Sequence, residues 1–233
     1  MNIFVVGSKP DAVFPDVVPD RVYAVNGAIG HAEEFAGTAE ITGVITRNVV
    51  FSDLAQDLET RKQWAGKRVD RIIVSGSRAR VSVDTLKMPI IIRNLGLGFD
   101  QFVYLGDDWI SRILNNRNKL KLAAEVLTRL RSGWPKSFCL ELKRTRILPE
   151  LSVSGGIRAL LIADREALPD SEIYLIGIGA RKSRGHYYDP KAVFDKHANQ
   201  DRNLLVDYKR RNPTSLVVTD RVLARYLRIV TAA

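Results

Sequence analysis

Ile3-Phe4-Val5-Val6-Gly7-Ser8, close to the start of the chain, is the stretch that decides the fold class. Consecutive apolar residues end at a glycine and a serine, which is typical of a short buried strand that runs into a turn. Similar runs recur, with helical or loop stretches between them, at residues 22–25, 41–46, 71–74, 101–105, 173–178 and 215–219. Such short runs are typical of parallel strands that helices cover on both faces. The sequence therefore predicts an α/β fold with an open, doubly wound, mostly parallel sheet.

Three segments between these runs have helical periodicity. Apolar residues recur on one face over residues 109–131, 154–168 and 190–211. The chain contains no internal repeat and no clear linker, so we expect a single domain over residues 1–233. The stretch near residues 80–100, with its glycine-rich turn at 95–98, leaves room for a small insertion or lid.

The composition favours a globular protein of a reducing compartment. Hydrophobic residues make up 45% of the chain and charged residues 27%, which is ordinary for a folded domain. No window of about 18 uninterrupted apolar residues is present, and the first residues lack the pattern of a signal peptide. The single cysteine, Cys139, cannot form an internal disulfide. We therefore expect a cytoplasmic protein.

The net charge of +10 is the strongest compositional deviation. Its basic residues are spread along the chain, with local clusters at residues 143–146, 181–184 and 209–211. Such a charge suits nucleic acid, an anionic membrane surface or acidic substrates, and it also fits a generally basic surface. Because no recognised nucleic-acid-binding motif accompanies it, we expect no nucleic-acid partner. Peripheral contact with the inner face of a membrane is a further expectation.

Small polar residues follow four successive predicted strands. They are Gly7 with Ser8, then Asn26, then Asn48, then Ser75 with Ser77. In a doubly wound sheet, ligands bind outside the carboxyl ends of the strands, where a glycine lets the backbone approach a phosphate. Ordinary turn chemistry explains any one of these residues, and no dinucleotide fingerprint or phosphate-binding loop is present. The repetition predicts a polar, uncharged binding rim.

The second half of the chain holds the residues best suited to catalysis. Ser154-Gly155-Gly156 precedes a predicted helix, where amide groups can bind a phosphate or serine can simply cap the helix. Further on stand His186-Tyr187-Tyr188-Asp189 and then His197 with Asp201. Imidazole can remove a proton near neutral pH, and tyrosine hydroxyls can donate hydrogen bonds to a leaving phosphate. Chemistry alone leaves open a loop with surface histidines and packed tyrosines.

The order of these motifs resembles that of the sialyltransferase family. Ser154-Gly155-Gly156 with the strand at 172–177 resembles that family's small motif. His186-Tyr187-Tyr188-Asp189 resembles its His-Tyr-Tyr-acidic motif, and His197 with Asp201 resembles its final His followed by an acidic residue. The segments 5–8 and 22–26 are similar to the donor-binding glycine strand and the Asn-bearing strand. The resemblance is thin over most of the chain and specific only over residues 152–206. It departs at Gly7-Ser8-Lys9-Pro10, where bacterial relatives tend to have Gly-Asn-Gly-Pro, and in the spacing of His197 and Asp201.

The resemblance implies an inverting, metal-independent transfer of a sialic-acid-like or related ulosonic sugar from a cytidine-monophosphate donor to a glycan hydroxyl. The fold implied is the sialyltransferase-type variant of the Rossmann-like fold, with no cofactor beyond the nucleotide-sugar co-substrate. The roles carried over are a general base at His197, phosphate-steadying groups at His186, Tyr187 and Tyr188, a supporting role for Asp201, and donor binding by Gly7, Ser8, Asn26, Asn48, Ser75, Ser154, Gly155 and Gly156.

Two other functions remain open at this point. The first is a different nucleotide-dependent transferase on the same sheet, such as a pyrophosphokinase-like relative that requires a divalent metal. The second is a basic nucleic-acid-binding module. Asp107-Asp108 fits the start of a helix better than a metal site, since acidic side chains stabilise helix N-termini. We therefore assign no metal ligand.

Overall fold

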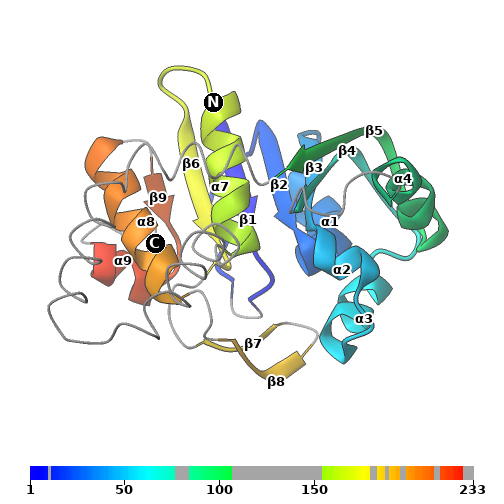
Figure 1. The fold of residues 1–233 in the computed structure, drawn as a ribbon. Coiled ribbons are helices and arrows are strands. Elements are labelled where there is room, and N and C mark those ends of the chain that lie inside the picture. Colours follow the sequence, from blue (N-terminus) through cyan, green and yellow to red (C-terminus); the bar gives the residue numbers. More distant parts are fainter. Residues whose placement is uncertain are drawn as a thin grey trace, which may run out of the picture.

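A seven-stranded, all-parallel sheet forms the centre of the molecule (Figure 1). The computed structural model describes residues 1–9, 12–76, 84–106, 154–178, 183–186, 189–194, 198–212 and 216–227. The strands are β1 (Asn2–Val6), β2 (Arg21–Val25), β3 (Glu40–Thr46), β4 (Lys67–Gly76), β5 (Leu97–Gly106), β6 (Glu172–Ile176) and β9 (Leu216–Val218). Their order across the sheet is β5-β4-β3-β2-β1-β6-β9. The fold is therefore an α/β fold of the general Rossmann-like kind.

Helices cover both faces of this sheet. On one face lie η1 (Asn26–His31), α1 (Ala32–Ala36), α2 (Arg47–Phe51), α3 (Ala55–Lys62) and α4 (Asp84–Asn94), all from the first half of the chain. On the other face lie α7 (Gly155–Glu166), α8 (Ala198–Arg211) and α9 (Arg221–Leu227). The sheet is doubly wound, as the sequence predicted.

Alternate residues of each strand belong to two separate cores. In β1, Ile3 and Val5 pack beneath α7, whereas Phe4 and Val6 pack on the opposite face. All four side chains are buried, which explains the uninterrupted apolar run in the sequence. Full burial of a side chain of this size contributes about 1.5–3 kcal/mol, so β1 is a large part of the stabilising core.

The sequence analysis located all seven strands of the main sheet. The helix predicted over residues 154–168 is also confirmed, as α7. The prediction over 190–211 was wrong in its first part, because residues 189–194 form a strand, β8 (Asp189–Phe194), and the helix begins at Ala198. The stretch considered for an insertion or lid contains α4 and β5, both part of the main fold. The helix predicted at 109–131 lies outside the described residues.

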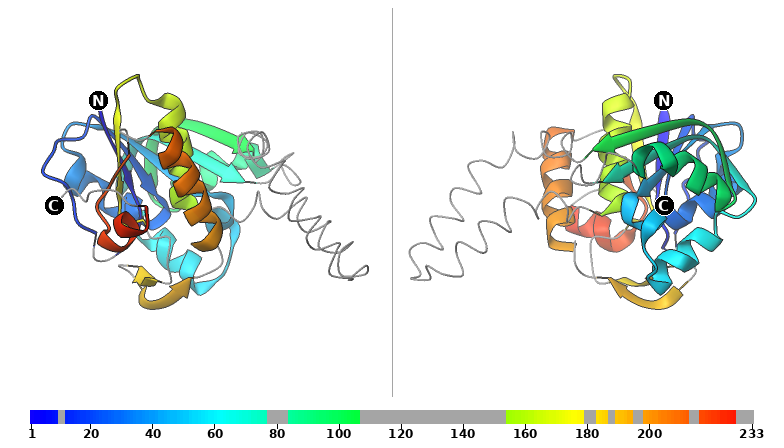
Figure 2. Two further views of the ribbon diagram at one scale, coloured as in Figure 1. Left: turned by 90° about the vertical axis from the view of Figure 1, so that its left-hand side faces the viewer. Right: turned by 45° about the vertical axis from the view of Figure 1, so that its right-hand side comes forward.

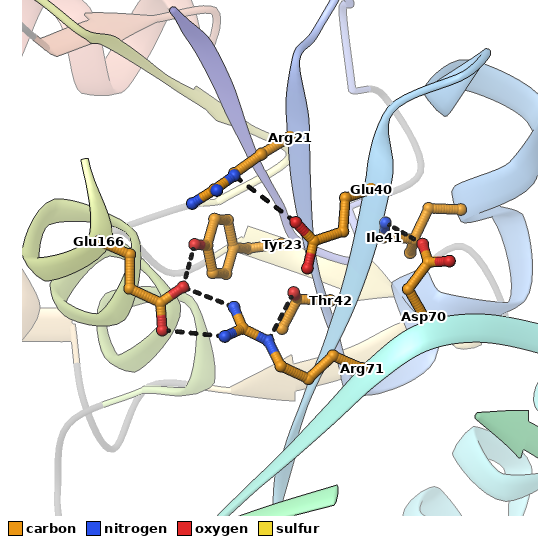
Figure 3. A network of polar contacts seen from close by, with 8 residues as sticks. All are labelled: Arg21, Tyr23, Glu40, Ile41, Thr42, Asp70, Arg71 and Glu166. Carbon is orange, nitrogen blue, oxygen red and sulfur yellow. Dashed lines mark hydrogen bonds and ion pairs between the residues drawn. The ribbon is translucent and has the colours of Figure 1, made fainter. Parts of the chain in front are cut away.

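A polar network near the amino ends of β2, β3 and β4 fixes the end of α7 (Figure 3). Arg71 donates to both carboxylate oxygens of Glu166, one of them at 3.2 Å from Nη1, and the Tyr23 hydroxyl donates to the same carboxylate at 2.7 Å. Burial raises the pKa of Tyr23, and its hydrogen bond to Glu166 raises it further. For Glu166, burial is outweighed by the hydrogen bonds from Arg71 and Tyr23, which lower the pKa of the carboxyl. Because its last residue is held at the amino edge, α7 places its first residues at the opposite, carboxyl edge.

Candidate functional site

The order of the strands reverses between β1 and β6, and their carboxyl ends meet in close backbone contact. The Gly7 amide donates to the Ile176 carbonyl at 2.8 Å. A Cβ added to Gly7 would lie only 2.5 Å from the Gly177 carbonyl oxygen, so no larger residue fits without a shift. Gly177 itself has a φ of +61°, which favours glycine. The reversal point is the position at which doubly wound sheets bind ligands.

Lys9 lies at this point, between the ends of β1 and β6. Its amide donates to the Gly177 carbonyl at 3.3 Å, and its ammonium lies 2.7 Å from a carboxylate oxygen of Asp220. The other Asp220 oxygen accepts the Leu223 amide at 2.7 Å and so caps α9. The side chains of Lys9 and Asp220 are only 14% and 17% exposed. The two groups connect the end of β1 with the start of α9.

Asn26 stands at the end of β2 in a strained backbone conformation, with a φ of +47°. Its side-chain oxygen accepts the Thr46 amide at 3.0 Å, and its carbonyl accepts the indole N–H of the fully buried Trp64 at 2.9 Å. These bonds hold Asn26 rigidly beside the end of β3. An added Cβ at Gly155 would lie 3.2 Å from the Asn26 side-chain nitrogen, so the start of α7 packs directly on this residue.

Glycines let the start of α7 approach the sheet. Ser154 is the N-cap, and its hydroxyl oxygen accepts the Ile157 amide at 3.3 Å. A Cβ on Gly155 would come within 2.7 Å of the Val25 side chain, and one on Gly156 within 3.0 Å of the Ile178 side chain. The Ser-Gly-Gly sequence therefore gives both a cap and close packing at the carboxyl edge.

Asp201, in the first turn of α8, is buried at this same helix start. Its carboxylate accepts the Ser154 amide at 3.1 Å, and its side chain is almost fully inaccessible to solvent. Burial raises the pKa of Asp201 to about 6, although hydrogen bonds from Ser154 and the charge of Arg158 act in the opposite direction. Asp201 therefore links α8 to the first residues of α7.

Two arginines lie beside the ends of β3 and β4. The buried Arg158 of α7 donates to the Ser75 hydroxyl, and the Arg47 guanidinium lies 4.8 Å from the Phe51 ring centroid. The Arg47 side chain also covers Gly76, since an added Cβ there would meet it at 2.5 Å. Ser75 was predicted to bind the donor, and its hydroxyl oxygen accepts from Arg158. Asn48, also predicted, lies exposed in α2.

Two residues of the motif His186-Tyr187-Tyr188-Asp189, His186 and Asp189, belong to a two-stranded ribbon. β7 (Ser183–His186) and β8 pair antiparallel, with His186 opposite Asp189. Figures 1 and 2 place this ribbon beyond the carboxyl ends of β1 and β6. Tyr187, Tyr188 and His197 lie outside the described residues, as does the position of the His186 side chain. Their catalytic assignments stay predictions.

The structure brings Gly7, Asn26 and the Ser154–Gly156 segment to one edge of the sheet. Sequence reasoning missed Lys9, Arg158 and Asp220 as members of this edge. The signal for Lys9 was present, because it directly follows the glycine and serine that end β1. Arg158 and Asp220 carried no comparable signal, since one stands on an apolar helix and the other follows a short strand.

No family model, no curated protein and no solved structure matches this chain. The class that the structure itself defines is an α/β protein with a seven-stranded, all-parallel sheet. Among the described residues, no group of three or more His, Cys, Asp or Glu side chains is placed to hold a metal ion. No helix in the described part of the chain is both long and apolar enough to cross a membrane.

Proposed function

We propose that the protein is an inverting, metal-independent glycosyltransferase that moves a sialic-acid-like or related ulosonic sugar from a cytidine-monophosphate donor to a glycan hydroxyl. One observation carries the proposal. Residues predicted to bind the donor from opposite halves of the sequence, Asn26 and Gly155, pack against each other at the carboxyl edge of the sheet. Gly7 lies at the end of the neighbouring strand β1, at the point where the strand order reverses.

The charges at this edge suit an anionic donor. Lys9, Arg47 and Arg158 come from three separate elements and stand at or near the ends of the central strands. Cations and backbone amides at a strand-end crevice are the groups that stabilise a nucleotide phosphate in many proteins. Asp201 and Asp220 partly offset this charge.

The proposed reaction is a single displacement at the anomeric carbon. The acceptor hydroxyl oxygen forms the new bond on the face opposite the phosphate, and the bond between the anomeric carbon and the phosphate oxygen breaks. The proton of the hydroxyl passes to His197 as general base, and cytidine monophosphate leaves with the bonding electron pair. His186, Tyr187 and Tyr188 donate hydrogen bonds to the leaving phosphate.

A thermal-shift screen of the four ribonucleoside monophosphates tests the donor class. Cytidine monophosphate is expected to raise the melting temperature more than the uridine, adenosine or guanosine nucleotide, because a ligand that binds only the folded state stabilises it. Equal or absent stabilisation by all four would contradict the proposal.

Donor turnover tests the chemistry. Release of cytidine monophosphate from a cytidine-monophosphate sugar is expected to continue in EDTA and to fall by at least about 100-fold in His197→Ala, since general-base catalysis contributes about 10²–10⁴-fold. His31→Ala is the matched control, because His31 pairs with Glu34 on the exposed surface. Transfer of pyrophosphate from a nucleoside triphosphate that needs a divalent metal and survives the His197 change, without release of cytidine monophosphate, would favour a pyrophosphokinase-like transferase. Salt-sensitive binding of nucleic acid without turnover would favour a nucleic-acid-binding module.

A further inference from the structure

The first backbone amide at the start of α7 already binds a carboxylate of the protein itself. The Ser154 amide donates to the Asp201 carboxylate, and the Ser154 hydroxyl accepts from the Ile157 amide. Asp201 is negatively charged above its pKa of about 6, so a phosphate bound to the Ser154 amide would face this charge. Arg158, on the same helix, is in turn engaged with Ser75. A further cation at the carboxyl edge would therefore help to balance the charge of the donor phosphate.

Lys9 has the position of such a cation. It follows Gly7 and Ser8 at the end of β1, and its amide is fixed to the end of β6 by the Gly177 carbonyl. An ammonium group has three N–H donors, and within the described part of the chain one of them is directed to Asp220. The Lys9 side chain keeps 14% of its surface exposed.

Asp220 fixes the direction of the Lys9 side chain. One of its carboxylate oxygens accepts the Leu223 amide and the other accepts from Lys9, so Asp220 is tied to the start of α9. A lysine that is already ordered loses less side-chain entropy when it binds a ligand than a free one does. We propose that Lys9 contacts the phosphate of the bound nucleotide and that Asp220 positions it for this contact. This inference takes the identity of its ligand from the proposed function.

The test compares cytidine monophosphate with cytidine, which lacks the phosphate, by isothermal titration calorimetry. Lys9→Met is expected to weaken binding of cytidine monophosphate by about 10- to 100-fold, as for the loss of a charge-assisted hydrogen bond. Cytidine affinity is expected to stay within about twofold, because the nucleoside makes no such contact. Lys9→Arg keeps the charge and is expected to retain most of the affinity for the nucleotide.

Asp220→Asn separates a phosphate contact from a purely structural ion pair. Asparagine also caps helices well, so α9 keeps its cap, while the carboxylate that positions Lys9 is removed. Because Lys9 is no longer held in place, this variant is expected to bind cytidine monophosphate about 2- to 10-fold more weakly than the wild type and to keep its cytidine affinity within about twofold. If Lys9→Met and Asp220→Asn weaken nucleotide and nucleoside alike, the pair is structural and the inference fails.

Lys62→Met is the matched control, because it also breaks an ion pair, the exposed one between Lys62 and Glu59 at 2.6 Å. It is expected to leave both affinities unchanged. Circular dichroism melting curves establish that each variant is folded.

Inorganic pyrophosphate separates this inference from the proposed function. Its binding to the wild type and to Lys9→Met is followed by amide chemical shifts of Gly7, Ser8 and Gly177. If no nucleotide binds but pyrophosphate shifts these amides only when Lys9 is present, the glycosyltransferase proposal fails and the phosphate contact stands. If pyrophosphate does not bind, or binds equally to both proteins, the Lys9 inference is overturned.

Discussion

The two edges of the central sheet use polar residues in opposite ways. At the amino edge, Arg71, Tyr23 and Glu166 bind one another, and the acid is satisfied from two sides. At the carboxyl edge, glycines bring backbones together and leave a buried Asp201 with a raised pKa and a partly exposed Lys9. A closed network suits stability, whereas a buried acid with a raised pKa at the carboxyl ends of the strands suits binding. The comparison predicts that amino-edge changes alter stability alone and carboxyl-edge changes alter both stability and binding.

The largest expected effect belongs to the amino edge. Glu166→Ala removes the common acceptor of Arg71 and Tyr23, and we expect a loss of about 3–4 kcal/mol in the free energy of unfolding, measured by urea denaturation. Nucleotide affinity is expected to be unchanged. Glu40→Gln, which breaks only the longer Arg21–Glu40 pair at 3.6 Å, is the control and should cost less than about 0.5 kcal/mol. If the two variants lose equal amounts of unfolding free energy, the buried network around Glu166 contributes no more to stability than the surface ion pair does.

The next effect is the pH dependence that Asp201 imposes. Its pKa in the folded state, about 6, lies above the ordinary value of 3.8, so the folded protein binds this proton more tightly than the unfolded chain does. The stabilisation from protonated Asp201 is therefore fully present below pH 3.8 and is lost as the pH rises through about 6. The loss amounts to about 2–3 kcal/mol.

Asp201→Asn isolates this contribution. The amide oxygen can still accept the Ser154 N–H but carries no charge at any pH. Relative to the wild type, the variant is therefore expected to gain about 2–3 kcal/mol of unfolding free energy between about pH 4 and pH 7.5, as judged by urea denaturation at each pH. Asp53→Asn, at a position 99% exposed, should show no such gain. A difference that does not change with pH would show that Asp201 has an ordinary pKa.

The smallest expected effect concerns the glycine packing. Gly155→Ala forces a contact of 2.7 Å with Val25, so we expect a loss of about 1–2 kcal/mol in unfolding free energy together with weaker binding of cytidine monophosphate. The control is Gly98→Ala, where the nearest atom to an added Cβ is 3.6 Å away. It should change neither quantity. Weaker binding without a stability loss would place Gly155 in direct contact with the ligand.

The inner strands β1, β2, β3 and β6 could be predicted because both of their faces are buried, so each apolar run is continuous in the sequence. Residues 183–194 gave no such run, and the β7–β8 ribbon was missed. The contacts that complete the carboxyl edge depend on distant pairs. Lys9 and Asp220 are separated by 211 positions, and Arg158 and Ser75 by 83. Only the arrangement of the strands brings such pairs together, and no local pattern encodes that arrangement.

The position of β1 in the sheet also has a consequence for synthesis on the ribosome. β1 pairs with β2 on one side and with β6 on the other, although β6 is made about 170 residues later. Until residues 172–176 emerge, the second edge of this apolar strand has unpaired amides and carbonyls. A nascent or truncated chain that ends before β6 therefore exposes unpaired backbone groups that strands of other chains can pair with. Protection by chaperones is needed most in that interval.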